Sequence, residues 1–206
     1  MNLFETLING NIRRLDSQHA SHCGGRCIDE QLIKFLSSHT DSGASNPVCD
    51  IKDPENEDLI NHFQIHKNTF DGLRPVTVRP PLILLHRFCP SKYATVISNK
   101  IKIDATIVKQ WFKVCVTSIL LCLKHFITSA KAVRVILMTG AFGRCPYIQR
   151  QILLEYPNVV LVEKGKIMDE VLRGALISVT GSETLPAAIQ VINVSELKLK
   201  AIKVNH

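Results

Sequence analysis

The chain has 206 residues, a mass of 23.1 kDa, a hydrophobic content of 46% and a mean hydropathy of +0.11. This length supports one good core or two small lobes that share one, and the composition excludes a disordered polar chain. The formal net charge of +7 would suit an anionic partner, but the 25 basic residues are scattered and aromatic residues make up only 6%. Because nucleic-acid-binding proteins gather basic residues on one face or arm, we expect no nucleic-acid partner.

The cysteines and the apolar segments bear on the cellular compartment. The seven cysteines have no regular spacing, and the opening segment contains Glu5 and lacks the basic start of a secretory signal. The longest apolar block, Val114–Leu123, has lysines on both sides and is much shorter than the ~20 apolar residues that a membrane span requires. We therefore expect a cytoplasmic protein with reduced cysteines and no membrane partner.

In chain order, residues 1–22 form a polar N-terminal segment with two short amphipathic pieces. The apolar spacing then predicts a helix over Asp29–Ser38 and a second over Leu59–Phe70. Residues 39–58 between them are rich in turn formers and charge, which predicts a flexible loop.

The middle of the chain predicts short strands and a long helix. Val76–Val78 and Leu82–Leu85 are expected to be strands on either side of Pro80-Pro81. Asp104 can cap a helix that ends near Thr128, whose apolar residues recur every three or four positions; they are Ile107, Trp111, Cys115, Ile119, Cys122 and Phe126.

The last third predicts further α/β structure. Val133–Met138 is expected to be a strand covered on both faces, because its apolar run is almost continuous. A helix over Pro146–Tyr156, a strand over Val159–Val162 and a helix over Asp169–Val179 follow. The last 25 residues could add one or two edge strands. The order of elements predicts an α/β fold with a sheet covered by helices.

The whole chain is organised around Val133–Gln149, a strand that ends in a glycine turn and runs into a helix. Turns of this kind often hold nucleotides, because glycine admits close approach and the helix start presents free N–H groups. One alternative is a Rossmann-type NAD(P)-binding reductase that uses Gly140, Gly143 and Glu163. Against it, Pro146 stands where the third glycine is needed, and too few residues follow to complete that fold.

A second alternative is a metal site. His19, His22, Cys23 and Cys27 lie within nine residues of one another. Structural zinc sites usually pair two such knuckles, and no matching pair of ligands follows in this chain. An ordinary glycine turn explains this segment without a metal.

Four stretches together resemble a known family. Val135–Gln149 resembles the adenosine motif of the 70-kDa heat-shock chaperones and other actin-like ATPases, a strand followed by Gly-Gly-x-x-Arg-x-Pro-x-x-Gln and a helix. Cys23–Asp29 is similar to the family's Gly-Gly-x-x-x-Asp turn, and Phe63–Gly72 to its Glu-x-x-Lys helix. Asp169–Ile177 resembles its helix that ends in Arg/Tyr-Gly-Ala. The stretches occur in the family's order.

The resemblance implies an adenosine pocket. Gly140 would let the backbone approach the sugar and phosphate, and Arg144 would stack its planar guanidinium on adenine. Lys67 would contact the ribose or phosphate side, and Gly24 and Gly25 would lie near the phosphates.

Several positions depart from the family's pattern. Ala141 replaces the second glycine, Phe142 replaces a polar residue as in divergent relatives, and Gln64 replaces the carboxylate of the Glu-x-x-Lys helix. Both phosphate loops, Asp-x-Gly-Thr-Thr and Asp-x-Gly-Gly-Gly-Thr, are absent from the sequence, as is the family's peptide-binding β-domain. Since those loops position the γ-phosphate, Mg²⁺ and water, ATP hydrolysis by this chain alone is not expected.

The resemblance therefore implies the second lobe of an actin-like ATPase (ribonuclease H-like) domain, with a mixed sheet covered by helices and the domain incomplete. Residues 23–180 would form this partial domain and residues 181–206 a tail. The expected ligand is ATP or ADP, with Mg²⁺ only when a partner chain supplies the missing lobe. A purely structural role with no ligand is the remaining possibility.

Overall fold

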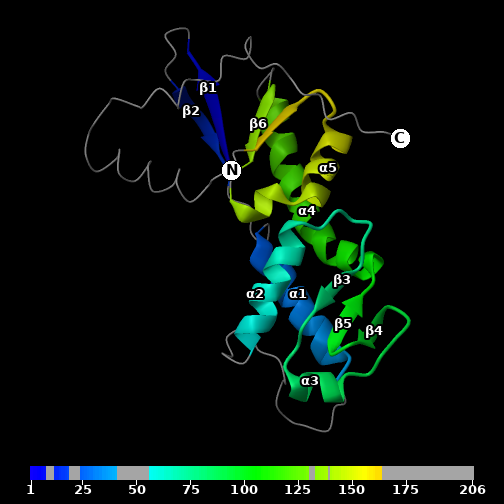
Figure 1. Ribbon diagram of the computed structural model, residues 1–206. Coiled ribbons are helices and arrows are strands. Elements are labelled where there is room, and N and C mark those ends of the chain that lie inside the picture. Colours follow the sequence, from blue (N-terminus) through cyan, green and yellow to red (C-terminus); the bar gives the residue numbers. More distant parts are fainter. Residues whose placement is uncertain (8–11, 19–23, 41–55, 130–132, 139, 164–206) are drawn as a thin grey trace, which may run out of the picture. The chain divides into compact units, whose positions relative to one another are not determined.

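The computed structural model describes residues 1–7, 12–18, 24–40, 56–129, 133–138 and 140–163 (Figure 1). The chain divides into two units, one of Met1–Leu3 and Asp16–Gly165, the other of Phe4–Leu15 and Lys166–His206. Every described helix belongs to the first unit, which also carries the candidate site. The predicted helix over residues 169–179 and the predicted strands of the last 25 residues lie outside the described residues.

The N-terminal segment forms a hairpin. Strand β1 (Asn2–Thr6) pairs with β2 (Ile12–Ser17). Its open end is closed by the N-terminal ammonium, which donates to the Gln18 carbonyl at 2.7 Å, while the Gln18 N–H donates to the Met1 carbonyl at 2.9 Å. The two amphipathic pieces expected from the sequence are thus strands.

Helices α1 and α2 confirm the two helices expected in the first third. Helix α1 (Gly25–Ser38) begins four residues before the predicted start at Asp29 and buries Ile28, Leu32 and Leu36. Helix α2 (Glu57–Asn68) takes the last two residues of the predicted loop, so the boundary expected at residue 58 was wrong. Residues 41–55 of that loop lie outside the described residues.

The strand predicted at Leu82–Leu85 is wrong, because this segment is helix α3 (Leu82–Arg87). The carbonyl of Pro81 accepts the N–H groups of Leu84 and Leu85 at 3.1 and 3.0 Å. Proline just ahead of a helix has a compatible φ, and a short apolar run does not distinguish a strand from a helix by periodicity.

A three-stranded antiparallel sheet contains one predicted strand and two that sequence analysis missed. Its order is β3 (Val76–Val78), β5 (Lys100–Ile103), β4 (Ala94–Ile97). Ser98 and Asn99 join β4 to β5 with φ values of 47° and 58°. Two-residue hairpin loops favour positive φ at both positions, which suits the twist of the flanking strands.

Helix α4 (Ala105–Ser129) confirms the predicted long helix and its cap. The Asp104 carboxylate accepts the Thr106 N–H at 2.7 Å and the Thr106 hydroxyl at 2.6 Å. Four of the six predicted stripe residues are buried, namely Trp111, Cys115, Ile119 and Phe126. Of the described helices, α4 alone is long and apolar enough to cross a bilayer, a test that core helices of soluble proteins also pass.

The end of the described chain is a βαβ unit. Strand β6 (Val135–Met138) pairs in parallel with β7 (Val160–Glu163), and helix α5 (Pro146–Glu155) connects them. The expectation that β6 is covered on both faces is wrong, because Val135 and Leu137 are exposed while Ile136 and Met138 pack against the core. Alternating exposure is the pattern of a strand with one covered face.

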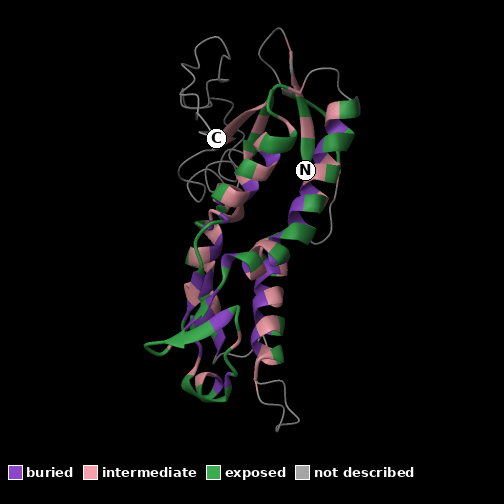
Figure 2. Cartoon of the chain, turned by 90° about the vertical axis from the view of Figure 1, so that its right-hand side faces the viewer, coloured by how far each residue is buried: buried purple, intermediate pink, exposed green. Residues whose placement is uncertain are grey.

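These elements establish the α/β class with small sheets and helices, which is coarser than the predicted actin-like lobe. The buried residues lie along one side of the helices, with exposed residues opposite (Figure 2). Phe112 of α4 packs against three aromatic rings from other parts of the chain. Its ring centroid lies 5.1 Å from that of Phe70, 5.6 Å from that of Tyr147 and 5.9 Å from that of Phe142.

Replacing Phe112 by alanine should therefore destabilise the protein strongly. The side chain is fully buried, and such a truncation costs about 3–5 kcal/mol of unfolding free energy. The matched control Val114→Ala, on the exposed side of the same helix, should change stability by no more than about 0.5 kcal/mol. Urea denaturation measures both, and equal losses would contradict the packing described.

Candidate functional site

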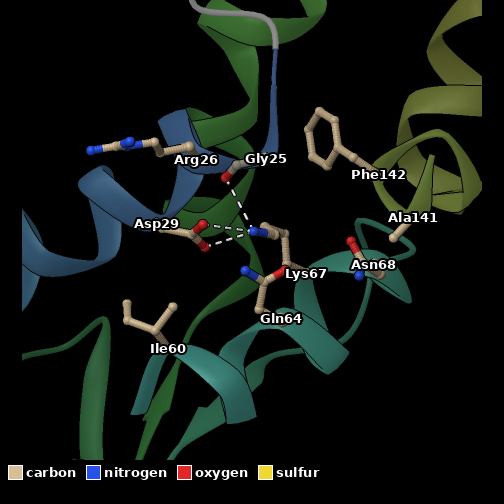
Figure 3. A pocket seen from close by; sticks show the side chains of 9 residues that line it. All are labelled: Gly25, Arg26, Asp29, Ile60, Gln64, Lys67, Asn68, Ala141 and Phe142. Carbon is tan, nitrogen blue, oxygen red and sulfur yellow. Dashed lines mark hydrogen bonds and ion pairs between the residues drawn. The ribbon is translucent and has the colours of Figure 1, made fainter. Parts of the chain in front are cut away.

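An open groove of about 650 Å³ lies where α1, α2 and the 3₁₀ turn η2 (Ala141–Arg144) come together (Figure 3). Its lining mixes charged, amide, aromatic and aliphatic side chains with one glycine. The lining residues are Gly25, Arg26, Asp29, Ile60, Gln64, Lys67, Asn68, Ala141 and Phe142. Three stretches that are far apart in the sequence therefore form one concave surface.

Four of the seven residues expected at the adenosine pocket line this groove: Gly25, Lys67, Ala141 and Phe142. The other three residues do not line the groove, although each lies within two positions in the sequence of a residue that does. Gly24 is the N-cap of α1, Gly140 precedes η2, and Arg144, half-buried, is the last residue of η2. The stacking of Arg144 on adenine stays a prediction.

Lys67 is held in a buried ion pair. Its ammonium donates to both carboxylate oxygens of Asp29, at 2.7 and 2.8 Å, and to the Gly25 carbonyl at 3.2 Å (Figure 3). The two side chains are only 2% and 6% exposed. These three bonds use all three N–H groups of the ammonium, so Lys67 fastens α2 to the start of α1 and does not point a free donor at the groove.

The electrostatics of the pair are dominated by burial. Desolvation raises the pKa of the Asp29 carboxyl above its usual value, and the hydrogen bonds and charge of Lys67 oppose that shift. A buried ion pair keeps both charges only while both partners are present, so loss of either side chain leaves an uncompensated charge.

Gly25 lies where the Lys67 side chain and the Phe142 ring approach the start of α1 closely. A Cβ built on Gly25 would lie 3.0 Å from the Lys67 Nζ, 3.2 Å from its Cε and 3.4 Å from a ring carbon of Phe142. A side chain here would require the end of the Lys67 side chain to move by a few tenths of an ångström. The glycine expected near the phosphates thus has a packing reason to be glycine.

The N-terminus of α1 adds positive potential to one end of the groove. Gly24 caps the helix without a side-chain hydrogen bond, and no acidic residue stands in the first turn. Its free N–H groups carry the positive end of the helix dipole. The Arg26 side chain of the same turn is 73% exposed and makes a long contact of 3.6 Å with Glu30.

The glycine turn after β6 directs two side chains at the groove. Gly140 has a φ of +82°, in the left-handed region that favours glycine, and its carbonyl accepts the Gly143 N–H at 3.1 Å. The Gln149 side chain donates to the Gly143 carbonyl at 3.0 Å and fixes the turn to α5. Ala141 and Phe142 of this turn then face α1 and α2 across the groove.

Sequence analysis gave no ligand-binding role to the other lining residues. A helical projection of α2 would have shown that several of them share one face. Ile60, Gln64 and Lys67 recur at three- and four-residue spacing on α2, and Asn68 completes the same face. Asp29 stood within the motif that carried the resemblance, but no pattern said that it would bind the lysine.

The structure describes the residues of the two alternative sites, the reductase site and the metal site, to different extents. Gly143 packs against Met138, where a Cβ would approach its side chain to 3.4 Å, and it does not line the groove. Glu163 lies opposite Met138 in the β6–β7 pair, and its side chain lies outside the described residues. For the metal site, His19, His22 and Cys23 are likewise outside them, and the described part of the chain holds no group of three His, Cys, Asp or Glu side chains able to bind a metal.

Comparison with protein-family models, with curated proteins and with solved structures finds no match to this chain. The chemistry of the groove must therefore be argued from its own residues. An aromatic ring, two amides and a cationic end suit a planar polar ligand that carries negative charge. Asp29, the carboxylate in the lining, is paired with Lys67.

The buried ion pair of Asp29 and Lys67 predicts how substitutions at these residues change the unfolding free energy. Asp29→Asn and Lys67→Met should each cost about 3–5 kcal/mol of unfolding free energy, because each leaves the partner's charge buried alone. The double variant Asp29→Asn/Lys67→Met should cost less than the sum of the two single losses, by about 2 kcal/mol or more.

Urea denaturation of the two single variants and the double variant measures this coupling. Glu30→Gln, which removes the exposed partner of Arg26, is the control and should cost less than about 1 kcal/mol. Strictly additive losses at residues 29 and 67 would show that the two side chains do not interact as described.

Proposed function

We propose that the groove binds the adenosine part of ATP or ADP, and that the chain is a degenerate or truncated module of the heat-shock-like, actin-type ATPase family without independent hydrolysis. One observation carries the proposal. Gly25, Lys67, Ala141 and Phe142 come from three separate stretches that the resemblance had assigned to one nucleotide pocket, and they line one groove.

The lining of the groove contains groups that suit the different parts of a nucleotide. The Phe142 ring, which lies close to Gly25, offers an aromatic face on which a base can stack, and the lining also contains the amides of Gln64 and Asn68. The lining carries the cations Arg26 and Lys67 and the anion Asp29, a net charge of +1. Since Lys67 and Asp29 neutralise each other, Arg26 and the start of α1 are left to attract the phosphates.

Hydrolysis is not part of the proposal. Phosphoryl transfer needs charge neutralisation and Mg²⁺ around the γ-phosphate, which the absent phosphate loops would supply. A partner chain that provides the missing lobe would restore them. Apolar side chains available for such a contact are Val114 and Leu121, which are exposed, and are seven residues apart on one side of α4.

The proposal predicts that ATP and ADP stabilise the whole chain against heat. At a nucleotide concentration tenfold above the dissociation constant, the melting temperature should rise by about 3–6 °C, and Mg²⁺ should not be needed. Phe142→Leu, which keeps an apolar side chain but removes the ring, and Arg26→Gln should each reduce the shift. Differential scanning fluorimetry or calorimetry measures it.

Arg87→Gln on α3 is the matched control for loss of an exposed arginine and should leave the nucleotide shift unchanged. Arg144→Ala tests in the same assay whether this neighbouring arginine also contacts the base. No shift with millimolar ATP or ADP would remove the proposal, and a shift with NADPH alone would favour the reductase alternative.

A further inference from the structure

Residues 72–103 carry most of the net positive charge of the chain. They form β3, α3, β4 and β5 (Figure 1) and contain six Lys and Arg residues but no Asp or Glu, so they contribute +6 to the total of +7. Among the residues that the structure describes, only Arg74 of these six forms an ion pair, at 3.4 Å from Asp71. The other five are Arg79, Arg87, Lys92, Lys100 and Lys102. Unbalanced charge of one sign attracts a partner of the opposite sign.

The register of the three-stranded sheet brings two of these cations together. Val78 of β3 pairs with Ile101 of β5, so the next positions along the two strands, Arg79 and Lys100, lie across from each other. Burial lowers the pKa of His62 on α2 below its usual value, and the charges of Arg79 and Lys100 lower it further, which places both cations near one point. Like charges opposite each other on a sheet repel, and an anion would relieve that repulsion.

Exposed aliphatic side chains lie at the same end of the sheet. Ile97 of β4 pairs with Lys100 and is 51% exposed. Leu82 begins α3 three residues after Arg79, so the Cα atoms of these two residues are within about 11 Å of each other. Leu82 and Ile83 are 63% and 55% exposed. Single exposed aliphatic residues are common, whereas several beside an unbalanced charge indicate an interaction surface.

The face of the sheet opposite the core adds a third cation. Ile101 and Ile103 of β5 are fully buried, and successive strand residues point to opposite faces. Lys102, between them, is therefore on the other face, where its cross-strand neighbours are Thr77 of β3 and Thr95 of β4. This face contains no acidic residue, because residues 72–103 contain none.

The mixture of cations and aliphatic side chains distinguishes between three kinds of anionic partner. A nucleic acid would use the cations only, and Tyr93 is the one exposed Phe, Tyr or Trp ring of residues 72–103 on which a base could stack. An extended acidic peptide would need a free strand edge, but Ser91 and Ala94 exchange hydrogen bonds of 2.8 and 3.2 Å on the outer edge of β4. A membrane surface uses both kinds of side chain, because aliphatic groups enter the interfacial layer while Lys and Arg stay beside the lipid phosphates.

We propose that this end of the sheet docks on a membrane surface that carries anionic lipids. The docking residues are Arg79, Leu82, Ile83, Ile97, Lys100 and Lys102. The proposal differs from the expectation of no membrane partner, because that expectation considered only segments that span a bilayer. It is also independent of the nucleotide groove, which none of these six residues lines.

Co-sedimentation of the full chain with lipid vesicles tests the proposal. Phosphatidylcholine vesicles that also contain phosphatidylserine should bind the chain and release it at high salt, whereas phosphatidylcholine alone should bind it far more weakly. Each Lys or Arg near an anionic surface tightens binding about fivefold, so Arg79→Gln/Lys100→Gln/Lys102→Gln should weaken binding about 100-fold. Leu82→Ser/Ile83→Ser should weaken it roughly tenfold.

Matched controls remove the same number of groups from other surfaces. Lys34→Gln/Lys113→Gln/Lys124→Gln lowers the net charge equally from exposed positions on α1 and α4, and should weaken binding by less than about threefold. Val114→Ser/Leu121→Ser removes two exposed aliphatic side chains of α4 and should leave binding unchanged. The melting temperature of each variant without vesicles should stay close to the native value, since these substitutions are at the surface.

Failure of the native chain to bind the phosphatidylserine vesicles would overturn the proposal, and so would equal weakening by the test variants and their controls. Oligouridylate and polyglutamate are the competing probes. If either binds the native chain and the Leu82→Ser/Ile83→Ser variant equally well while the vesicles do not bind, the cations serve a nucleic acid or an acidic peptide, and the membrane role is excluded.

Discussion

The buried pair of Lys67 and Asp29 is the interaction on which the candidate site depends. It joins α2 to α1, and the third bond of the ammonium reaches the Gly25 carbonyl at the start of α1. The pair fixes the two helices to each other at the groove, beside the apolar core to which both contribute. The pair also changes the role of the lysine, from a residue expected to touch the ligand to one that positions the residues around it.

Local signals were sufficient for much of the fold. The cap at Asp104 and the apolar stripe behind it specify α4 almost to its ends, and Pro146 marks the start of α5. Prediction failed where a short segment had two physically reasonable conformations. Leu82–Leu85 was predicted to be a strand because its short apolar run also suits one, and Pro81 was not considered as a helix start. The hairpin turn at Ser98 and Asn99 lacks the glycine that usually indicates such a turn.

The candidate site, like the fold, could be predicted only in part. The resemblance to the actin-like ATPases was enough to expect that Gly25, Lys67 and Phe142 share one surface, and all three line the groove. The direction in which a charged side chain points depends on tertiary contacts, so the pairing of Lys67 with Asp29 could not be expected from spacing. Sequence thus located the groove better than it described the chemistry inside it.

Nuclear magnetic resonance titration of the full chain with ADP tests the central claim most directly, because it reports where a ligand binds without assuming which residues matter. The account predicts that backbone amide resonances of Gly25, Asn68 and Phe142 shift together with one dissociation constant, while those of α3 stay unchanged. No shift at millimolar ADP, or shifts confined to residues away from α1, α2 and η2, would contradict it.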